Sequence, residues 1–378
     1  MKIRINSFYA LQAIFISGFL GLIYLQTFAI PAIRGESEVV AFVGDSFEYQ
    51  ERARTKSTAE LLSYGYNPKA LLYGYSLNFF GISMVGKIAQ QLSDKHYEYI
   101  VFFLNFFLLI FTIKNCQDIF EFYKSPNYAI FLLLFFCNPV IVANLASLNK
   151  EIWGLYFIIS FLRNRIYKAY AKYFLVMLFS FLIRDVFFVT GALFFLMTTL
   201  KIKRVFYLII ISILAPFVVP EAMVHHSTEV GQRSAILMDF FANIQSYPFG
   251  YLFTYFPKLM INMYTGLYPP RWACLSFHNI YEFFSLISSA MFFFCSLIIV
   301  YKIILFRKRR QGSSILISIF CAFSFVHCLI SYSVHRYYFP LYPIVVILAL
   351  LNFTKTNPKA VKTCDSRNFN PQIIGLSI

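Results

Sequence analysis

The polar residues of this sequence that could do chemistry stand in four short clusters. The first is GDSFEY at residues 44–49. A carboxylate such as Asp45 can take the proton from an attacking hydroxyl, and Glu48 is a second candidate acid beside it. The same spacing, an Asp followed three residues later by a Glu, also resembles a capping box, which starts a helix and needs no catalytic role. The two roles are compatible.

The second and third clusters combine a base with an acid. Lys150 precedes Glu151, and Lys is a point-charge ligand for phosphate. The alternative is a self-paired Lys-Glu at a helix start, with the amine reaching the membrane surface. Arg184 precedes Asp185, and the planar fork of Arg suits a phosphate or diphosphate. A purely structural ion pair at a tight turn is the alternative.

The fourth cluster is HRYY at residues 335–338, followed by two prolines. Anchoring at a membrane surface explains its tyrosines, but it does not explain Arg336. A further group, His225, His226 and Arg233, lies in a polar stretch where a solvated loop is the ordinary interpretation. We therefore take Asp45 and Glu48 as catalytic candidates and Lys150, Arg184 and Arg336 as phosphate-binding candidates. Secondary candidates are Glu151, Asp185, His225, His226 and Arg233.

The elements that must position these clusters are membrane helices. Of the 378 residues, 59% are hydrophobic and only 13% are charged, and 47 are Phe. A soluble domain usually carries about 25% charged residues, whereas a bilayer accommodates ~20 apolar residues per crossing helix. We predict an all-α, polytopic integral membrane protein with about ten spans. The predicted apolar runs are 8–30, 97–113, 127–146, 152–162, 173–184, 186–200, 205–219, 279–301, 313–333 and 336–353.

Two of these predictions rest on individual residues. The run 173–200 is divided in two because Arg184-Asp185 would be costly in the middle of a bilayer. Asn138-Pro139 is expected to end a helix, since Pro cannot donate a backbone hydrogen bond. The first run is longer than the apolar part of a signal peptide, so we expect an uncleaved first span.

The distribution of charge predicts the orientation. If the N-terminus is inside and the spans alternate, the short inner segments hold 20 of the 33 basic residues and three of the acidic ones. This is the positive-inside pattern, and it explains the net charge of +16 without a nucleic-acid partner. The outer side is then almost neutral, and all four clusters lie on it.

This topology predicts a single transmembrane domain over residues 1–355 and a cytoplasmic tail over 356–378, with both termini inside. The long outer loops are about 31–95 and 220–278, and each is expected to hold an interfacial helix, at 70–92 and 237–264. The seven cysteines form no C-x-x-C pair and are expected to pack as small apolar side chains. No nucleotide-binding glycine motif or zinc-protease motif occurs, and no inner segment is long enough to fold around a nucleotide.

The order of these parts resembles the GT-C class of membrane glycosyltransferases, which use polyprenyl-phosphate-linked sugars. The resemblance rests on the acidic first loop at Asp45, the helix 67–92, Pro139 followed by Lys150-Glu151, Arg184, and the motif RYYFPLYP at 336–343. It implies that Asp45 is the catalytic carboxylate, that Arg184 or Arg336 contacts the donor phosphate, and that the protein works at the outer face of a bacterial inner membrane. No clear second acidic pair for a divalent cation is present, so the need for a metal stays open.

The chain is also similar in length, span count and composition to bacterial O-antigen and exopolysaccharide polymerases, in which Arg233 and Arg271 could serve as loop arginines. The two families share an outer-face site and a lipid-linked substrate, and the sequence does not separate them. Two other classes are less favoured. A transporter or flippase would place charges near the bilayer midplane and show repeated halves. A scaffold would not need the clustered charges.

Overall fold

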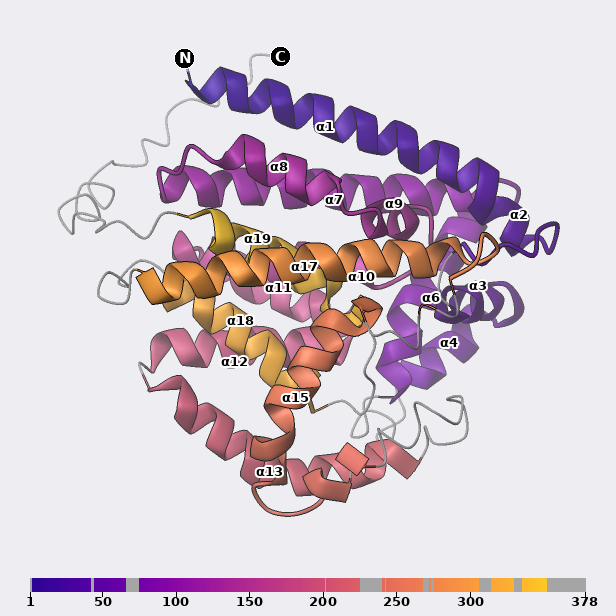
Figure 1. Ribbon diagram of the computed structural model, residues 1–378. Helices are drawn as coiled ribbons and strands as arrows, with labels where there is room; N and C mark the ends of the chain where they lie inside the picture. Colours follow the sequence, from indigo (N-terminus) through magenta and orange to yellow (C-terminus); the bar gives the residue numbers. More distant parts are fainter. Residues whose placement is uncertain are drawn as a thin grey trace, which may run out of the picture.

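The computed structural model describes residues 2–41, 44–65, 75–200, 202–224, 240–241, 243–267, 272, 275–305, 314–329 and 335–351. Within this part of the chain every regular element is a helix, as predicted (Figure 1). The first half contains α1 (Lys2–Tyr24), a π-helical turn η1 (Leu25–Ala29), α2 (Ile30–Ile33), α3 (Gly44–Thr55), α4 (Thr58–Gly65), α6 (Tyr75–Leu92), α7 (Tyr97–Phe122), α8 (Tyr128–Phe136), α9 (Val140–Leu145) and α10 (Glu151–Ile166). The second half contains α11 (Tyr170–Ile183), α12 (Asp185–Thr199), α13 (Arg204–Val224), α15 (Gly250–Tyr264), η2 (Thr265–Leu267), α17 (Ile280–Leu305), α18 (Ser314–His327), η4 (His335–Leu341) and α19 (Tyr342–Leu350).

Three helical stretches are long and apolar enough to cross a membrane: Ser7–Ile33, Tyr97–Phe122 and Ile280–Ile304. They correspond to α1 with its continuation, α7 and α17, which all run across the molecule in roughly similar directions in Figure 1. Five further predicted runs overlap shorter apolar helices, which include α11, α12 and α18. The run 152–162 lies within α10, and the run 127–146 is divided between α8 and α9. Within the described residues, three of the predicted runs contain a helix of full spanning length.

The helix breaks predicted from Pro139 and Arg184 are confirmed. α8 ends before Asn138, and the Asn138 carboxamide oxygen accepts a hydrogen bond from the Val140 amide at the start of α9 (3.2 Å). Arg184 has an extended backbone (φ −164°, ψ 123°) and separates α11 from α12. Both breaks put polar side chains at the ends of helices and not within an apolar run.

α10 is the central helix of the bundle, and two glycines permit close packing around its site-bearing end. A Cβ on Gly154 would collide with the ring of Phe187, so the glycine lets this ring of α12 pack directly on the backbone of α10. A Cβ on Gly81 would collide with the backbone carbonyl of Leu182, which brings α6 against the end of α11. The turn between α11 and α12 is thereby held between α6 and α10.

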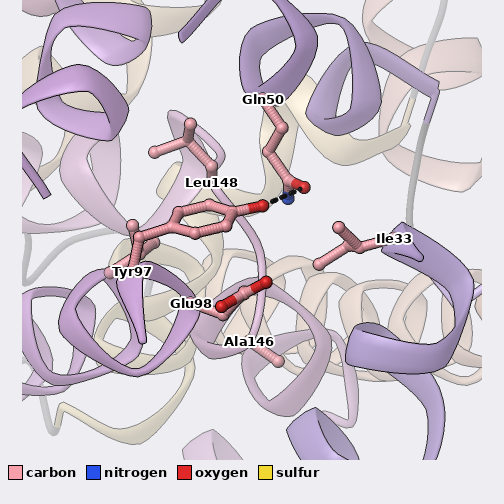
Figure 2. Close-up of a pocket in the computed structure, with 7 residues that line it drawn as sticks. Ile33, Gln50, Tyr97, Glu98, Ala146 and Leu148 are labelled. Atoms are coloured by element: carbon pink, nitrogen blue, oxygen red, sulfur yellow. Dashed lines mark hydrogen bonds between the residues drawn. The ribbon is translucent and has the colours of Figure 1, made fainter. Parts of the chain in front are cut away.

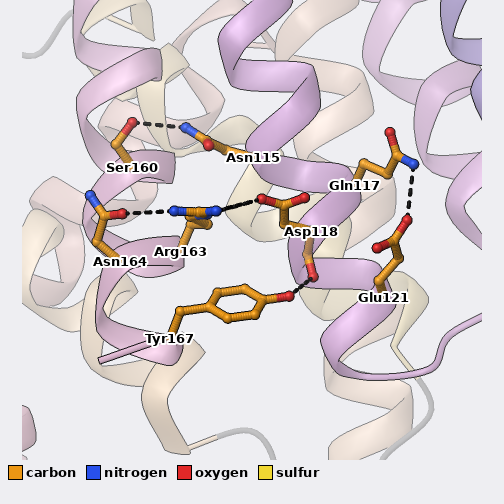
Figure 3. Close-up of polar contacts among 8 residues, drawn as sticks. All are labelled: Asn115, Gln117, Asp118, Glu121, Ser160, Arg163, Asn164 and Tyr167. Carbon is orange, nitrogen blue, oxygen red and sulfur yellow. Dashed lines mark hydrogen bonds and ion pairs between the residues drawn. The ribbon is translucent and has the colours of Figure 1, made fainter. Parts of the chain in front are cut away.

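Polar contacts connect those helix ends that the predicted topology places on the inner side. Arg163 of α10 pairs with Asp118 of α7, with Nη2 2.9 Å from Oδ2, and the hydroxyl of Tyr167 donates to the Asp118 carbonyl (Figure 3). Lys302 donates to the carbonyls of Ala349 and Leu351 at the end of α19. Basic residues of the inner segments thus bind the exposed carbonyls and acids of neighbouring helix ends, as expected from the negative C-terminal end of a helix.

The opposite end of the bundle carries α3, α4 and α6, which gather beside the end of α1 (Figure 1). The capping box predicted at Asp45 and Glu48 is wrong in its register. α3 already begins at Gly44, so Asp45 lies inside its first turn, and Glu48 pairs with Arg52 one turn later. A capping box does occur at α4, where Ser57 and Glu60 bond reciprocally (2.7 and 3.2 Å) and this contact lowers the pKa of the Glu60 carboxyl.

Candidate functional site

Asp45 is positioned by the first turn of α3, where a negative charge is favoured by the helix dipole. Its Oδ2 accepts a long hydrogen bond from the hydroxyl of Tyr49, one turn further along (3.5 Å). Tyr49 is fully buried, whereas Asp45 is half-buried. Glu48, the second catalytic candidate, is instead engaged by Arg52 in a half-exposed ion pair. Of the two acids, Asp45 is the one directed towards the rest of the site.

Lys150 and Glu151 form the start of α10, and the loop before them is tied to α7. The carboxamide of Asn105 donates to the carbonyls of Asn144, Leu145 and Ser147, at 3.3, 3.2 and 2.9 Å. Both charged side chains are buried, so the interpretation of Lys150 as a surface-reaching amine is wrong. Lys150 is covered by neighbouring elements, so its amine does not reach the protein surface.

The amine of Lys150 connects the first cluster to the third. Its Nζ lies 4.7 Å from the centroid of the Tyr49 ring, in a cation–π arrangement. Lys150 also lies close enough to Asp185 to act on that carboxylate electrostatically, as Arg184 does. Three clusters that lie far apart in the sequence are therefore adjacent in space, in the order Asp45, Tyr49, Lys150, Asp185 and Arg184.

Arg184 is buried at the break between α11 and α12, and not exposed at a surface turn. Its guanidinium lies over the ring of Phe187, 5.8 Å from the centroid. It also acts electrostatically on His327, the last residue of α18. The extended backbone of Arg184 and the two short helices that flank it hold this cation at a fixed place beside α10.

The fourth cluster lies on η4, which packs against α10 and α15. The side chain of Arg336 lies outside the described residues, and so do His225, His226, Arg233 and Arg271. Tyr338 of η4 is buried, and its hydroxyl lies 2.9 Å from the Cys328 sulfur. The backbone of this cluster is thus brought to the same end of the bundle as the other three.

Sequence reasoning missed Lys258, which is buried on α15 and donates to the Gln245 carboxamide oxygen (3.3 Å). Burial lowers the pKa of its amine to about 8. α15 belongs to the segment predicted to be an interfacial helix. It buries Thr254 and Asn262 along with Lys258, next to apolar residues such as Tyr251, while Phe253 and Phe256 are exposed. The recurrence of Thr, Lys and Asn at four-residue intervals was the available signal.

A small pocket lies between α3 and the start of α7, lined in part by Gln50, Tyr97 and Glu98 (Figure 2). The Tyr97 hydroxyl donates to the Gln50 carboxamide oxygen (3.2 Å). Glu98 is buried, and its Oε1 lies 3.8 Å from a guanidinium nitrogen of Arg54. Sequence reasoning missed this acid too, because a single Glu at the head of a long apolar helix resembles a favourable first-turn charge.

Six acidic, basic or histidine side chains of the described residues are at most 6% exposed. They are Glu98, Lys150, Glu151, Arg184, Lys258 and His327. The charges on the predicted inner side, such as Asp118 and Arg163, remain partly exposed. Burying an ionisable group is costly unless other interactions compensate, so this concentration marks the candidate site.

Within the part of the chain that the structure describes, no group of three or more His, Cys, Asp or Glu side chains could hold a metal ion. Neither a protein-family model, nor a curated protein sequence, nor a solved structure matches the chain. The assignment of a function therefore depends on the arrangement of the charged residues.

Proposed function

We propose that this protein is a polytopic membrane glycosyltransferase that takes a polyprenyl-phosphate-linked sugar at the outer face of a bacterial inner membrane and acts in surface-polysaccharide assembly. The observation that supports it is the row formed by half-buried Asp45 and the buried cations Lys150 and Arg184, at the end of the bundle opposite the basic inner loops. The row combines a carboxylate with two cations, which are the groups that the transfer of a sugar from a phosphate requires.

In this mechanism Asp45 takes the proton from the acceptor hydroxyl as the hydroxyl attacks the anomeric carbon. The bond from that carbon to the phosphate oxygen breaks, and negative charge develops on the phosphate. Lys150 and Arg184 stabilise this charge, and their burial strengthens the interaction because the surroundings have a low dielectric constant. Asp185 lies near enough to both cations to interact with them electrostatically before the substrate binds.

The cost of burying charged groups supports a functional role for these residues. A Lys, Arg or Asp in the centre of an apolar span costs about 2.5–3.5 kcal/mol on insertion scales, and such residues face a protein interior and mark functional pathways. A purely structural bundle would not need two cations and several acids beneath its surface. Their position at helix ends also differs from the midplane site expected of a transporter.

The test is complementation of a strain that lacks the gene. Wild-type protein is expected to restore the surface glycan on a gel, and Asp45→Asn is expected to reduce it at least tenfold at equal protein level. Glu48→Gln is the matched control, because Glu48 is paired with Arg52 on the same helix. A normal glycan from Asp45→Asn would refute the role of Asp45. If the strain without the gene makes a glycan of one repeat unit but lacks the series of longer chains on the gel, the protein would be assigned to polymerisation.

A further inference from the structure

His327 was not among the residues that the sequence marked for function, yet it lies beside Arg184. It is the last residue of α18 and is 2% exposed. Its ring stacks on Phe323, with centroids 3.7 Å apart and planes inclined by 12°. The rings of Phe187 and Tyr338 complete its surroundings, at 6.2 and 6.0 Å. The histidine is thus held rigidly by aromatic side chains from three elements.

The hydrogen bonding of the ring assigns its tautomer. Nδ1 lies 3.0 Å from the carbonyl oxygen of Phe323, one turn earlier. A carbonyl oxygen only accepts hydrogen bonds, so Nδ1 carries the proton and Nε2 presents a lone pair. A charged imidazolium buried among aromatic rings would be costly, so the ring is a neutral imidazole whose Nε2 is an acceptor.

This acceptor has no hydrogen-bond donor within the described part of the structure. A buried polar atom without a partner costs roughly 1–3 kcal/mol, and a Phe or Leu would fill the same aromatic site without that cost. Packing alone therefore does not account for a histidine here. An O–H or N–H donor from a bound molecule would remove the penalty.

Arg184 and His327 would contact different groups of a bound ligand. Arg184 offers only donors, which suits the oxygens of a phosphate. Nε2 of His327 offers only an acceptor, which suits a hydroxyl and is repelled by phosphate oxygens. A molecule that carries a phosphate next to hydroxyl groups would satisfy both, and a sugar phosphate has this pattern.

We propose that His327 Nε2 accepts a hydrogen bond from a hydroxyl of the carbohydrate part of the substrate, beside the phosphate held by Arg184. This inference rests on the proposed glycosyl transfer and adds a residue that orients the sugar. It involves no transfer of a proton to His327.

Two reciprocal substitutions test it. His327→Asn keeps an amide that can donate to the Phe323 carbonyl, as Nδ1 does, but it removes the acceptor at Nε2. His327→Gln reaches the Nε2 position with its carboxamide oxygen and gives up the Nδ1 contact. We expect Asn to reduce the glycan at least tenfold in the complementation assay and Gln to retain at least a third of it. Protein level and thermal unfolding of the purified variants are measured alongside, with the exposed His96→Asn as control.

The opposite order of effects would overturn the inference. If Gln is as impaired as Asn or more so, the Nδ1 contact matters and the role is structural. A wild-type glycan from Asn would also refute it. If Arg184→Gln reduces the amount of glycan while His327→Asn leaves it at the wild-type level, only this inference fails and the proposed function stands. An unchanged glycan in the strain without the gene would remove the proposed function and this inference with it.

Discussion

The Nζ of Lys150 lies 4.7 Å from the centroid of the Tyr49 ring, and this contact joins the start of α10 to the helix that carries Asp45. A cation–π interaction contributes roughly 0.5–2 kcal/mol, with the larger values where water is excluded. The same tyrosine donates to Asp45, so one side chain touches both the proposed base and a proposed phosphate ligand. Its ring and its hydroxyl can be tested separately.

Tyr49→Phe keeps the ring under Lys150 and removes the hydrogen bond to Asp45. We expect it to retain glycan synthesis within a few-fold of wild type, because the 3.5 Å bond is long. Tyr49→Leu removes the ring as well, and we expect synthesis to fall at least tenfold. The complementation assay measures both. Equal activity of the Phe and Leu variants would show that the ring does not position Lys150.

Because the amine of Lys258 is buried, we expect the stability of the protein to depend on pH. Burial lowers its pKa from 10.5 to about 8, so between these values the unfolded chain binds a proton that the folded protein does not. The free energy of unfolding should therefore rise with pH from about 8 to about 10.5, by on the order of 3 kcal/mol in total. Lys258→Met should remove this rise and increase stability at pH 7.

Thermal unfolding in detergent across this pH range measures the effect. The exposed Lys95→Met serves as the control and should follow the wild-type curve. If Lys258→Met and wild type rise in parallel, the buried amine is not the source of the dependence.

Gly154 should not tolerate a side chain, because a Cβ there would meet the ring of Phe187. Extra volume in a packed core costs roughly 1–3 kcal/mol, and we expect this loss from Gly154→Ala. Phe187 also lies under Arg184, so the variant should lose glycan synthesis as well. Phe187→Leu in the same chain should recover part of the stability. Strictly additive losses in the double variant would contradict direct contact between the two positions.

The ion pair of Asp118 and Arg163 should affect stability without affecting the reaction. Asp118→Asn removes the charge opposite a partly buried guanidinium, and we expect a loss of roughly 1–3 kcal/mol. Exchanging the residues, as Asp118→Arg with Arg163→Asp, should restore part of it. Activity per folded molecule should stay at the wild-type level in both cases. A selective loss of activity would place this pair in the working machinery.

The helical elements and their breaks were predictable because local chemistry determines them. Pro139 removes a backbone donor, and the charges at Arg184-Asp185 oppose an uninterrupted apolar helix, so both boundaries are visible in the sequence. The register of α3 was not predictable from Asp45 and Glu48, because Glu48 also matches Arg52 one turn later. Two local pairings competed, and the ion pair formed.

The candidate site was predictable only in its charges. Lys150 and Arg184 were conspicuous because they are charged residues at the ends of apolar runs on the predicted outer side. His327 lies in an apolar run and looks like an ordinary core position, and Tyr49 looks like an ordinary aromatic residue beside two candidate acids. Their significance depends on contacts between α3 and α10 and between α18 and α12, which no local pattern reveals.

Lys258 shows a different limit. The helical periodicity of α15 separates a polar face from an apolar face, but it does not say which face is buried. In α15 the side that carries Thr254, Lys258 and Asn262 is buried, while Phe253 and Phe256 are exposed. Which side is buried depends on what packs against the helix in the assembled bundle.

The lengths of α11 and α12 have a consequence for the surrounding bilayer. They contain 14 and 15 residues, which at a rise of 1.5 Å per residue is about 21 and 22 Å, against about 30 Å for the hydrocarbon thickness. Their outward faces carry exposed apolar side chains such as Leu175, Phe179 and Val189. Such a mismatch is relieved when the bilayer thins locally. Lipid headgroups would then lie deeper beside Arg184 than elsewhere, so the acyl-chain length of the host membrane becomes a determinant of how far a phosphate must travel to reach it.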